Sequence, residues 1–208
     1  MNPVLRPHHA SYALLDPTGA AAGREELSLE KRAGGYFYLS TLETTYPSET
    51  EAEVRWQLDE RLVTRLLHIH SVDSWGEEYD LEVTITGNGL LAHRAAPHGP
   101  TQVELGWGPR AELDYISAAF PAVIMARSFA GGGSARTVDA VEFGVEDLVP
   151  VIVSRRYQRT GQAAEGGITA QCLTEETGHA STVEVSAGGV LLGYEGLLRL
   201  EELDAPMK

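Results

Sequence analysis

Residues 79–89 read YDLEVTITGNG, and this stretch decides the fold class. Apolar residues from Tyr79 to Ile85 alternate with the polar residues between them, which is typical of a strand with one buried face. The stretch ends in Gly87-Asn88-Gly89, and Asn-Gly is a strong hairpin signal because both residues tolerate a positive φ. The sequence therefore predicts two antiparallel strands joined by a tight turn.

The same two-residue period recurs along most of the chain from about Glu26 onward. Val54–Leu58 and Val183–Val185 repeat it, and turn signals such as Asp73–Gly76 and Ala187–Gly189 separate the runs. Strands joined by such short turns must pair antiparallel, because a parallel pair needs a long crossover. We predict an all-β, mainly antiparallel protein with a curved sheet or half-open barrel of about 10–12 strands.

One segment, Ser117–Phe129, breaks this pattern because it is rich in helix formers and apolar on nearly every side. Proline is tolerated in the first turn of a helix, so a short helix beginning near Pro121 is predicted. A helix that is apolar all round is buried. We expect the curved sheet to pack around this helix, with Gly131–Ser134 as the connector that follows it.

The chain is predicted to form a single β domain over residues 26–208. Residues 1–25 show little periodicity and contain the Ala/Gly-rich segment Thr18–Gly23. An extended or flexible N-terminal arm is predicted there.

Composition excludes several classes of partner. The chain has 208 residues, with 16 Lys and Arg against 30 Asp and Glu and a formal net charge of −14, which argues against a nucleic-acid partner. No apolar run approaches the roughly 20 residues that span a bilayer, and the first residues lack the pattern of a secretory signal. The one cysteine, Cys172, lies in a predicted strand and is expected to pack there rather than act as a nucleophile. These features predict a cytoplasmic protein.

Two histidines form the weak candidate for a metal site. His68 and His70 are two residues apart in a predicted strand over Leu62–Val72, which places both imidazoles on one face. A metal would need a third ligand, for which His93 or a carboxylate is the candidate. The alternative is that both rings lie exposed on, or packed into, the polar face of the sheet. The sequence contains no phosphate loop or dinucleotide-binding glycine motif, and no cofactor is predicted.

Cations and aromatic residues are the more informative side chains in so acidic a chain. Five arginines fall in or beside predicted strands or the apolar helix: Arg65, Arg94, Arg127, Arg155 and Arg156. Arg127 can pair with helix carbonyls or with a carboxylate such as Asp114, or it can grip a ligand's phosphate or carboxylate. Aromatic rings such as Trp56, Tyr157 and Tyr194 suit either core packing or contact with sugars and lipid headgroups.

Four segments, taken together and in this order, resemble a known family. They are Asp59–Arg65, Gly87–Leu90, Asp114–Arg127 and Val185–Arg199. They are similar to corresponding segments of the glycolipid-binding family of bacterial proteins, over about residues 36–200. The resemblance implies a fold like that of lipoprotein carriers, in which a curved sheet wraps an acyl chain.

From this resemblance and the residues above, we expect the chain to bind an amphiphilic small molecule, a lipid or glycolipid. The acyl part is expected to lie against inward-facing apolar residues, and arginines are expected to hold the headgroup, with tyrosines at the rim. The candidate ligand-binding residues are Trp56, Arg65, Leu66, Asp114, Ile124, Met125, Arg127, Tyr157 and Tyr194.

Two alternatives remain open at this stage. The first is an enzyme on the same scaffold, a hydrolase or isomerase that uses a carboxylate and His68 or His70. The second is an interaction protein whose sheet packs against another copy of the chain as a homo-oligomer. A hollow concave face favours the lipid hypothesis, and a face filled by the protein's own helix leaves only the shape of a lipid carrier.

Overall fold

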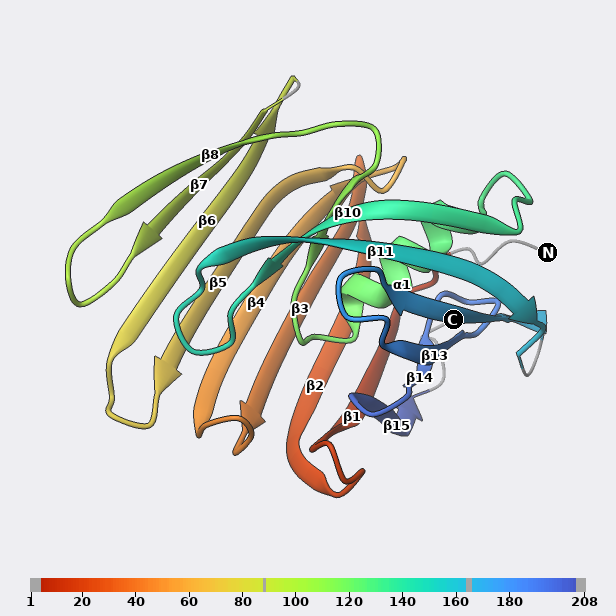
Figure 1. Ribbon diagram of the computed structural model, residues 1–208, viewed down its shortest axis with the longest axis horizontal. Coiled ribbons are helices and arrows are strands. Elements are labelled where there is room, and N and C mark those ends of the chain that lie inside the picture. Colours follow the sequence, from red (N-terminus) through yellow and green to blue (C-terminus); the bar gives the residue numbers. More distant parts are fainter. Residues whose placement is uncertain (1–4, 88, 164–165, 205–208) are drawn as a thin grey trace.

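The computed structural model describes residues 5–87, 89–163 and 166–204, which form one long curved sheet with a helix against its concave face (Figure 1). The strands are β1 (His8–Leu15), β2 (Ala21–Arg32), β3 (Gly35–Thr44), β4 (Thr50–Asp59), β5 (Thr64–Asp73), β6 (Glu78–Thr86), β7 (Gly89–Ala95), β8 (Thr101–Gly106), β9 (Ala111–Asp114), β10 (Ala135–Phe143), β11 (Pro150–Gly161), β12 (Ile168–Thr174), β13 (Ala180–Val185), β14 (Leu191–Tyr194) and β15 (Leu198–Asp204), and the helix is α1 (Ala119–Phe129).

The strands of the described residues are ordered β8-β7-β6-β5-β4-β3-β2-β1-β15-β14-β13-β12-β11-β10-β9. Almost all neighbours pair antiparallel, and the pairing of β1 with β15 joins the two halves of the chain. The exception is β9, which is parallel to β10 because α1 forms the crossover between them. Since β8 and β9 are edges, the sheet does not close into a barrel. The predicted all-β, mainly antiparallel curved sheet around one short helix is confirmed, with more strands than expected.

The hairpin predicted at residues 79–89 is formed by β6 and β7. Alternation matches burial here, since Leu81 is fully buried and its polar neighbour Glu82 is exposed. Gly87 has a φ of 60°, a left-handed conformation that glycine adopts without steric cost. Asn88, the other half of the hairpin signal, lies outside the described residues.

The prediction of an extended or flexible arm over residues 1–25 is wrong for residues 5–25, the part of this range that the structure describes. Strand β1 and the first residues of β2 lie in the middle of the sheet order, between β15 and β3. The five consecutive residues Ala10–Leu14 are all buried. Because β1 is buried on both faces, it has no polar–apolar alternation, and this absence made it look irregular in the sequence.

The concave face is filled by α1. The helix begins at Ala119, close to the predicted start at Pro121. The ring of Phe120 stacks on that of Trp56 in β4, with centroids 4.4 Å apart and planes 13° apart. Both side chains are at most 2% exposed, so the space that was expected to hold an acyl chain holds the protein's own helix.

A buried carboxylate in β2, Glu25, connects the sheet to the start of this helix. The hydroxyls of Ser40 in β3 and Ser117 donate hydrogen bonds to its Oε1, each at 2.5 Å. The backbone N–H of Ala118 donates to its Oε2 at 2.9 Å. Ala118 precedes the helix and has no side chain able to cap it, and Glu25 accepts its N–H as a capping-box glutamate does within other helices.

Burial raises the pKa of Glu25, while the hydrogen bonds from Ser117, Ser40 and Ala118 oppose part of that rise. The group is fully buried, so its hydrogen bonds are the compensation for removing a carboxyl from water.

Replacing Glu25 with alanine leaves three buried donors without their acceptor. We expect Glu25→Ala to lower the free energy of unfolding by about 2–4 kcal/mol, measured by urea denaturation. Glu26→Ala is the control, because the Glu26 side chain is 55% exposed and pairs only with exposed Arg24. The control should change stability by less than about 0.5 kcal/mol. Equal losses in the two variants would contradict the anchoring role of Glu25.

The raised pKa of Glu25 also predicts a pH dependence. Below the ordinary value of 4.5, both the folded and the unfolded chain hold this proton. As pH rises from there, the unfolded chain ionises first, so wild type loses stability that Glu25→Gln does not lose. The unfolding free energy of wild type minus that of Glu25→Gln should therefore fall as pH is raised from about 4.5 towards 7. A difference that stays constant or grows with pH would show that the pKa of the Glu25 carboxyl is not raised in the folded protein.

Candidate functional site

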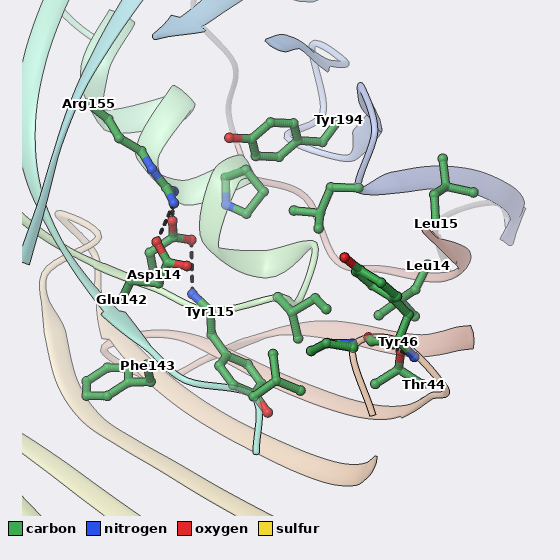
Figure 2. A pocket seen from close by; sticks show the side chains of 15 residues that line it. Leu14, Leu15, Thr44, Tyr46, Asp114, Tyr115, Glu142, Phe143, Arg155 and Tyr194 are labelled. Carbon is green, nitrogen blue, oxygen red and sulfur yellow. Dashed lines mark hydrogen bonds and ion pairs between the residues drawn. The ribbon is translucent and has the colours of Figure 1, made fainter. Parts of the chain in front are cut away.

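A partly enclosed pocket of about 220 Å³ lies where the ends of several strands meet the first turn of α1 (Figure 2). Its walls come from segments far apart in the sequence, including the β3–β4 turn, the end of β9 and the β10–β11 loop. The residues that line it are Leu14, Leu15, Thr44, Tyr46, Pro47, Asp114, Tyr115, Ile116, Pro121, Glu142, Phe143, Val145, Arg155, Tyr194 and Leu197.

Most of this lining is apolar or aromatic. Tyr46 is 45% exposed and is held in its turn by Thr44, whose hydroxyl donates to the Tyr46 carbonyl at 2.8 Å. The Tyr46 N–H donates back to the same Thr44 oxygen at 3.1 Å. Ile116, which precedes α1, and Pro121, in the first turn of α1, form another part of the wall. An apolar molecule can therefore leave water by entering this space.

The pocket has one charged end, formed by Asp114, Glu142 and Arg155. The parallel pairing of β9 with β10 places Asp114 beside Glu142. Arg155 contacts Asp114 Oδ2 through Nη1, and its Nη2 donates to Glu142 Oε2 at 2.6 Å (Figure 2). Asp114 Oδ1 also accepts the N–H of Tyr115 at 2.9 Å. The charged end is therefore fixed by contacts within the protein.

The three charged side chains differ in their access to solvent. Asp114 is 7% exposed and Arg155 12%, whereas 44% of the Glu142 side chain remains exposed. Burial raises the pKa of the Glu142 carboxyl. Two carboxylates against one guanidinium leave the charged end negative when all three groups are ionised.

Behind the charged end, two tyrosines pack around Cys172. The Tyr194 hydroxyl donates to Cys172 Sγ at 3.5 Å, and Tyr157 pairs with Cys172 across β11 and β12. Burial is the largest cause that raises the pKa of both tyrosine hydroxyls, so they stay neutral at pH 7. Cys172 is 2% exposed, as expected for a packed residue.

Of the predicted ligand-binding residues, Asp114 and Tyr194 line the pocket. Trp56, Ile124 and Met125 are at most 2% exposed in the core. They pack in the hydrophobic core, and none of the three is among the described residues that line the pocket.

Leu66 was expected to face inward, but its neighbour Leu67 takes that position and is fully buried. The cause is an irregularity in the β4–β5 pairing, where Gln57 pairs with Leu66 and Leu58 with Thr64. The extra residue, Arg65, shifts the side-chain alternation by one position.

The two arginines proposed to hold a headgroup are paired with carboxylates elsewhere. Arg127 contacts Glu112, a buried residue of β9, rather than Asp114. Arg136 also pairs with Glu112, at 2.9 Å. Arg65 is 69% exposed and lies 3.4 Å from Asp59. Neither Arg65 nor Arg127 is among the described residues that line the pocket; the cation there is Arg155.

His68 and His70 share one carboxylate, Asp80 of β6. Their ring nitrogens lie 3.4 Å and 3.1 Å from Asp80 Oδ1. Within residues 5–87, 89–163 and 166–204, no group of three or more His, Cys, Asp or Glu side chains is arranged to hold a metal ion. Both histidines are partly exposed on the sheet, which matches the alternative considered above.

Sequence patterns did not single out Glu142 or Tyr46. Glu142 stands between Val141 and Phe143 in a strand where both faces are largely covered, so alternation does not mark it. The β9–β10–β11 pairing that brings it to Asp114 and Arg155 is a tertiary feature.

Comparison with known proteins supports the fold but does not identify the function. No protein-family model matches the chain, and no curated protein matches it. A DUF1089 family protein of Pseudomonas aeruginosa aligns with a TM-score of 0.58 and 15% identity, over 84% of this chain and 91% of that one. A β-barrel-like protein of the domain of unknown function DUF1849 from Brucella abortus aligns with a TM-score of 0.64 and 11% identity, over 98% and 99% of the two chains.

At these identities the likeness shows a shared β-barrel-like fold. Among the described residues, none of the helical segments has the length and apolar character needed to cross a bilayer.

Arg127 pairs with a buried carboxylate and Arg65 forms an exposed pair, so replacing them should affect stability differently. Glu112 is 3% exposed, so Arg127→Met removes one partner of a buried carboxylate. This substitution should lower the free energy of unfolding by about 2–3 kcal/mol. The loss is limited because Arg136 still pairs with Glu112. Arg65→Met breaks an exposed pair and should cost less than about 1 kcal/mol. Thermal or urea denaturation measures both. A larger loss for Arg65→Met would contradict this assignment.

Proposed function

We propose that this protein binds a small amphiphilic molecule in the pocket beside the first turn of α1. The observation that carries the proposal is one cavity of about 220 Å³ whose walls are mostly apolar and whose one end carries Asp114, Glu142 and Arg155. Pockets with apolar walls and a few fixed polar groups are the usual form of a small-molecule site. The apolar part of the ligand would lie along the walls, and its polar group would face the charged end.

The volume limits the size of the ligand. An apolar cavity of about 150 Å³ accommodates benzene, so a space of about 220 Å³ accommodates roughly a six- to eight-carbon chain. A long acyl chain wrapped by the whole sheet is excluded in this conformation, because α1 packs against Trp56 and the rest of the concave core. A lipid or glycolipid would therefore insert only part of an acyl chain.

The hydrophobic effect supplies useful but modest affinity in such a site. Each buried methylene contributes about 0.8 kcal/mol, so six contribute about 5 kcal/mol before the costs of association. Because the costs of association reduce this gain, a simple alkyl ligand binds no more tightly than a dissociation constant of roughly 0.1–1 mM. A physiological ligand would add contacts at the charged end.

The two alternative hypotheses have less support from the geometry. The enzyme hypothesis needs a histidine beside a carboxylate in a pocket. His70 lines a separate surface depression with Glu43, Glu51 and Glu53, but neither His68 nor His70 is among the described residues that line the partly enclosed pocket. The interaction hypothesis needs a broad apolar surface. Among the described residues, the exposed large apolar side chains are one short run, Val149, Val151 and Ile152, and three from other parts of the chain, Tyr46, Trp75 and Leu203.

A substitution that fills the pocket tests the proposal. Val145 lines the pocket and is half-buried, whereas Val149 in the same loop is 41% exposed and lies outside the lining. We expect Val145→Trp to abolish binding of octyl glucoside, measured by calorimetry below the concentration at which it forms micelles. Wild type and Val149→Trp should bind it saturably and equally.

Absence of saturable binding to wild type would overturn the proposal. So would equal binding by Val145→Trp, since the ligand would then lie elsewhere. Circular dichroism of each variant establishes that the sheet is intact.

A further inference from the structure

The charged end and the aromatic lining of the pocket suggest which headgroup it takes. We propose that the ligand's polar group is a cation, an alkylammonium, and that the site discriminates against anionic amphiphiles. This inference rests on the proposed function and names its ligand class.

The guanidinium of Arg155 is already paired with two carboxylates of the protein. Its Nη1 contacts Asp114, and its Nη2 donates to Glu142 at 2.6 Å. Figure 2 shows the guanidinium directed at these two carboxylates. Among the described residues that line the pocket, Arg155 is the one cationic side chain. A sulfate, phosphate or carboxylate headgroup would have to displace an existing ion pair to reach it.

The sign of the net charge at the charged end of the pocket also favours a cationic ligand. When Asp114, Glu142 and Arg155 are all ionised, the charged end has one excess negative charge. Glu142 carries that charge where a ligand can reach it, because 44% of its side chain is exposed. An anionic headgroup would meet like charge in a partly enclosed space, where screening by water is reduced. The net charge of −14 for the whole chain also favours the approach of cations.

The aromatic character of the walls favours a cationic ligand as well. Tyr46, Tyr115, Phe143 and Tyr194 all line the pocket. They come from different elements, and in Figure 2 Tyr194 lies on the side of Arg155 and the carboxylates, whereas Tyr46 lies at the opposite side of the pocket. The faces of aromatic rings attract cations, and aromatic residues combined with a carboxylate are a recurrent means of binding ammonium groups. Burial raises the pKa of Tyr115, so its ring stays a neutral phenol at pH 7.

Three probes with the same eight-carbon chain test the inference: octylammonium, octyl glucoside and octyl sulfate. Calorimetry at pH 7 and constant ionic strength, below micelle-forming concentrations, measures each affinity. We expect wild type to bind octylammonium at least tenfold more tightly than octyl sulfate, with octyl glucoside between them.

A matched pair of variants tests the role of Glu142. Glu142→Gln should reduce the ratio of octylammonium to octyl sulfate affinity about tenfold. Glu146→Gln removes the same charge from an exposed residue of the β10–β11 loop that lies outside the pocket lining. It should leave the ratio unchanged.

The outcomes separate the two proposals. Octyl glucoside binding without a preference for octylammonium would overturn the cation inference and leave the amphiphile site intact. An equal effect of Glu146→Gln and Glu142→Gln would overturn it as well, because the preference would then come from overall charge. Failure of all three probes to bind would overturn both proposals. The wild-type ratio decides the question even if Glu142→Gln fails to fold.

Discussion

The carboxyl group of Glu25 joins the centre of the sheet to the start of α1 and determines how the concave face is used. It accepts hydrogen bonds from Ser40 on the neighbouring strand and from Ser117 and Ala118 at the helix entrance. Because a buried carboxyl is tolerated only with such partners, the helix start has one favourable position. With the entrance fixed there, Phe120 stacks on Trp56 and the helix fills the curve of the sheet.

The same constraint shapes the remaining cavity. Ser117 and Ala118 lie between Ile116 and Pro121, which both belong to the pocket wall. Anchoring this short segment to the sheet therefore also positions the wall against the end of β9. The sheet is curved, but the protein's own helix occupies the centre of its concave face, and the pocket that remains lies at one end.

Much of the fold was predictable because most strands have one buried and one exposed face. Apolar and polar residues therefore alternate along their sequences with a period of two. Strand β1 was not predictable this way, since Ala10–Leu14 are buried on both faces. Glu25 gave no sign of burial, because its partner Ser117 is 92 residues away. Asp114 and Tyr194 were among the candidate ligand-binding residues and line the pocket, whereas Leu66 was expected to face inward and does not, because of the bulge at Arg65.

The central claim is that the helix keeps its place while an amphiphile enters only the end pocket. A crystal structure of the protein grown with octylammonium tests this most directly. We expect electron density for the alkyl chain between Ile116 and Leu197, with Phe120 still stacked on Trp56. Density for the chain against Trp56, with α1 moved out of the concave face, would contradict it.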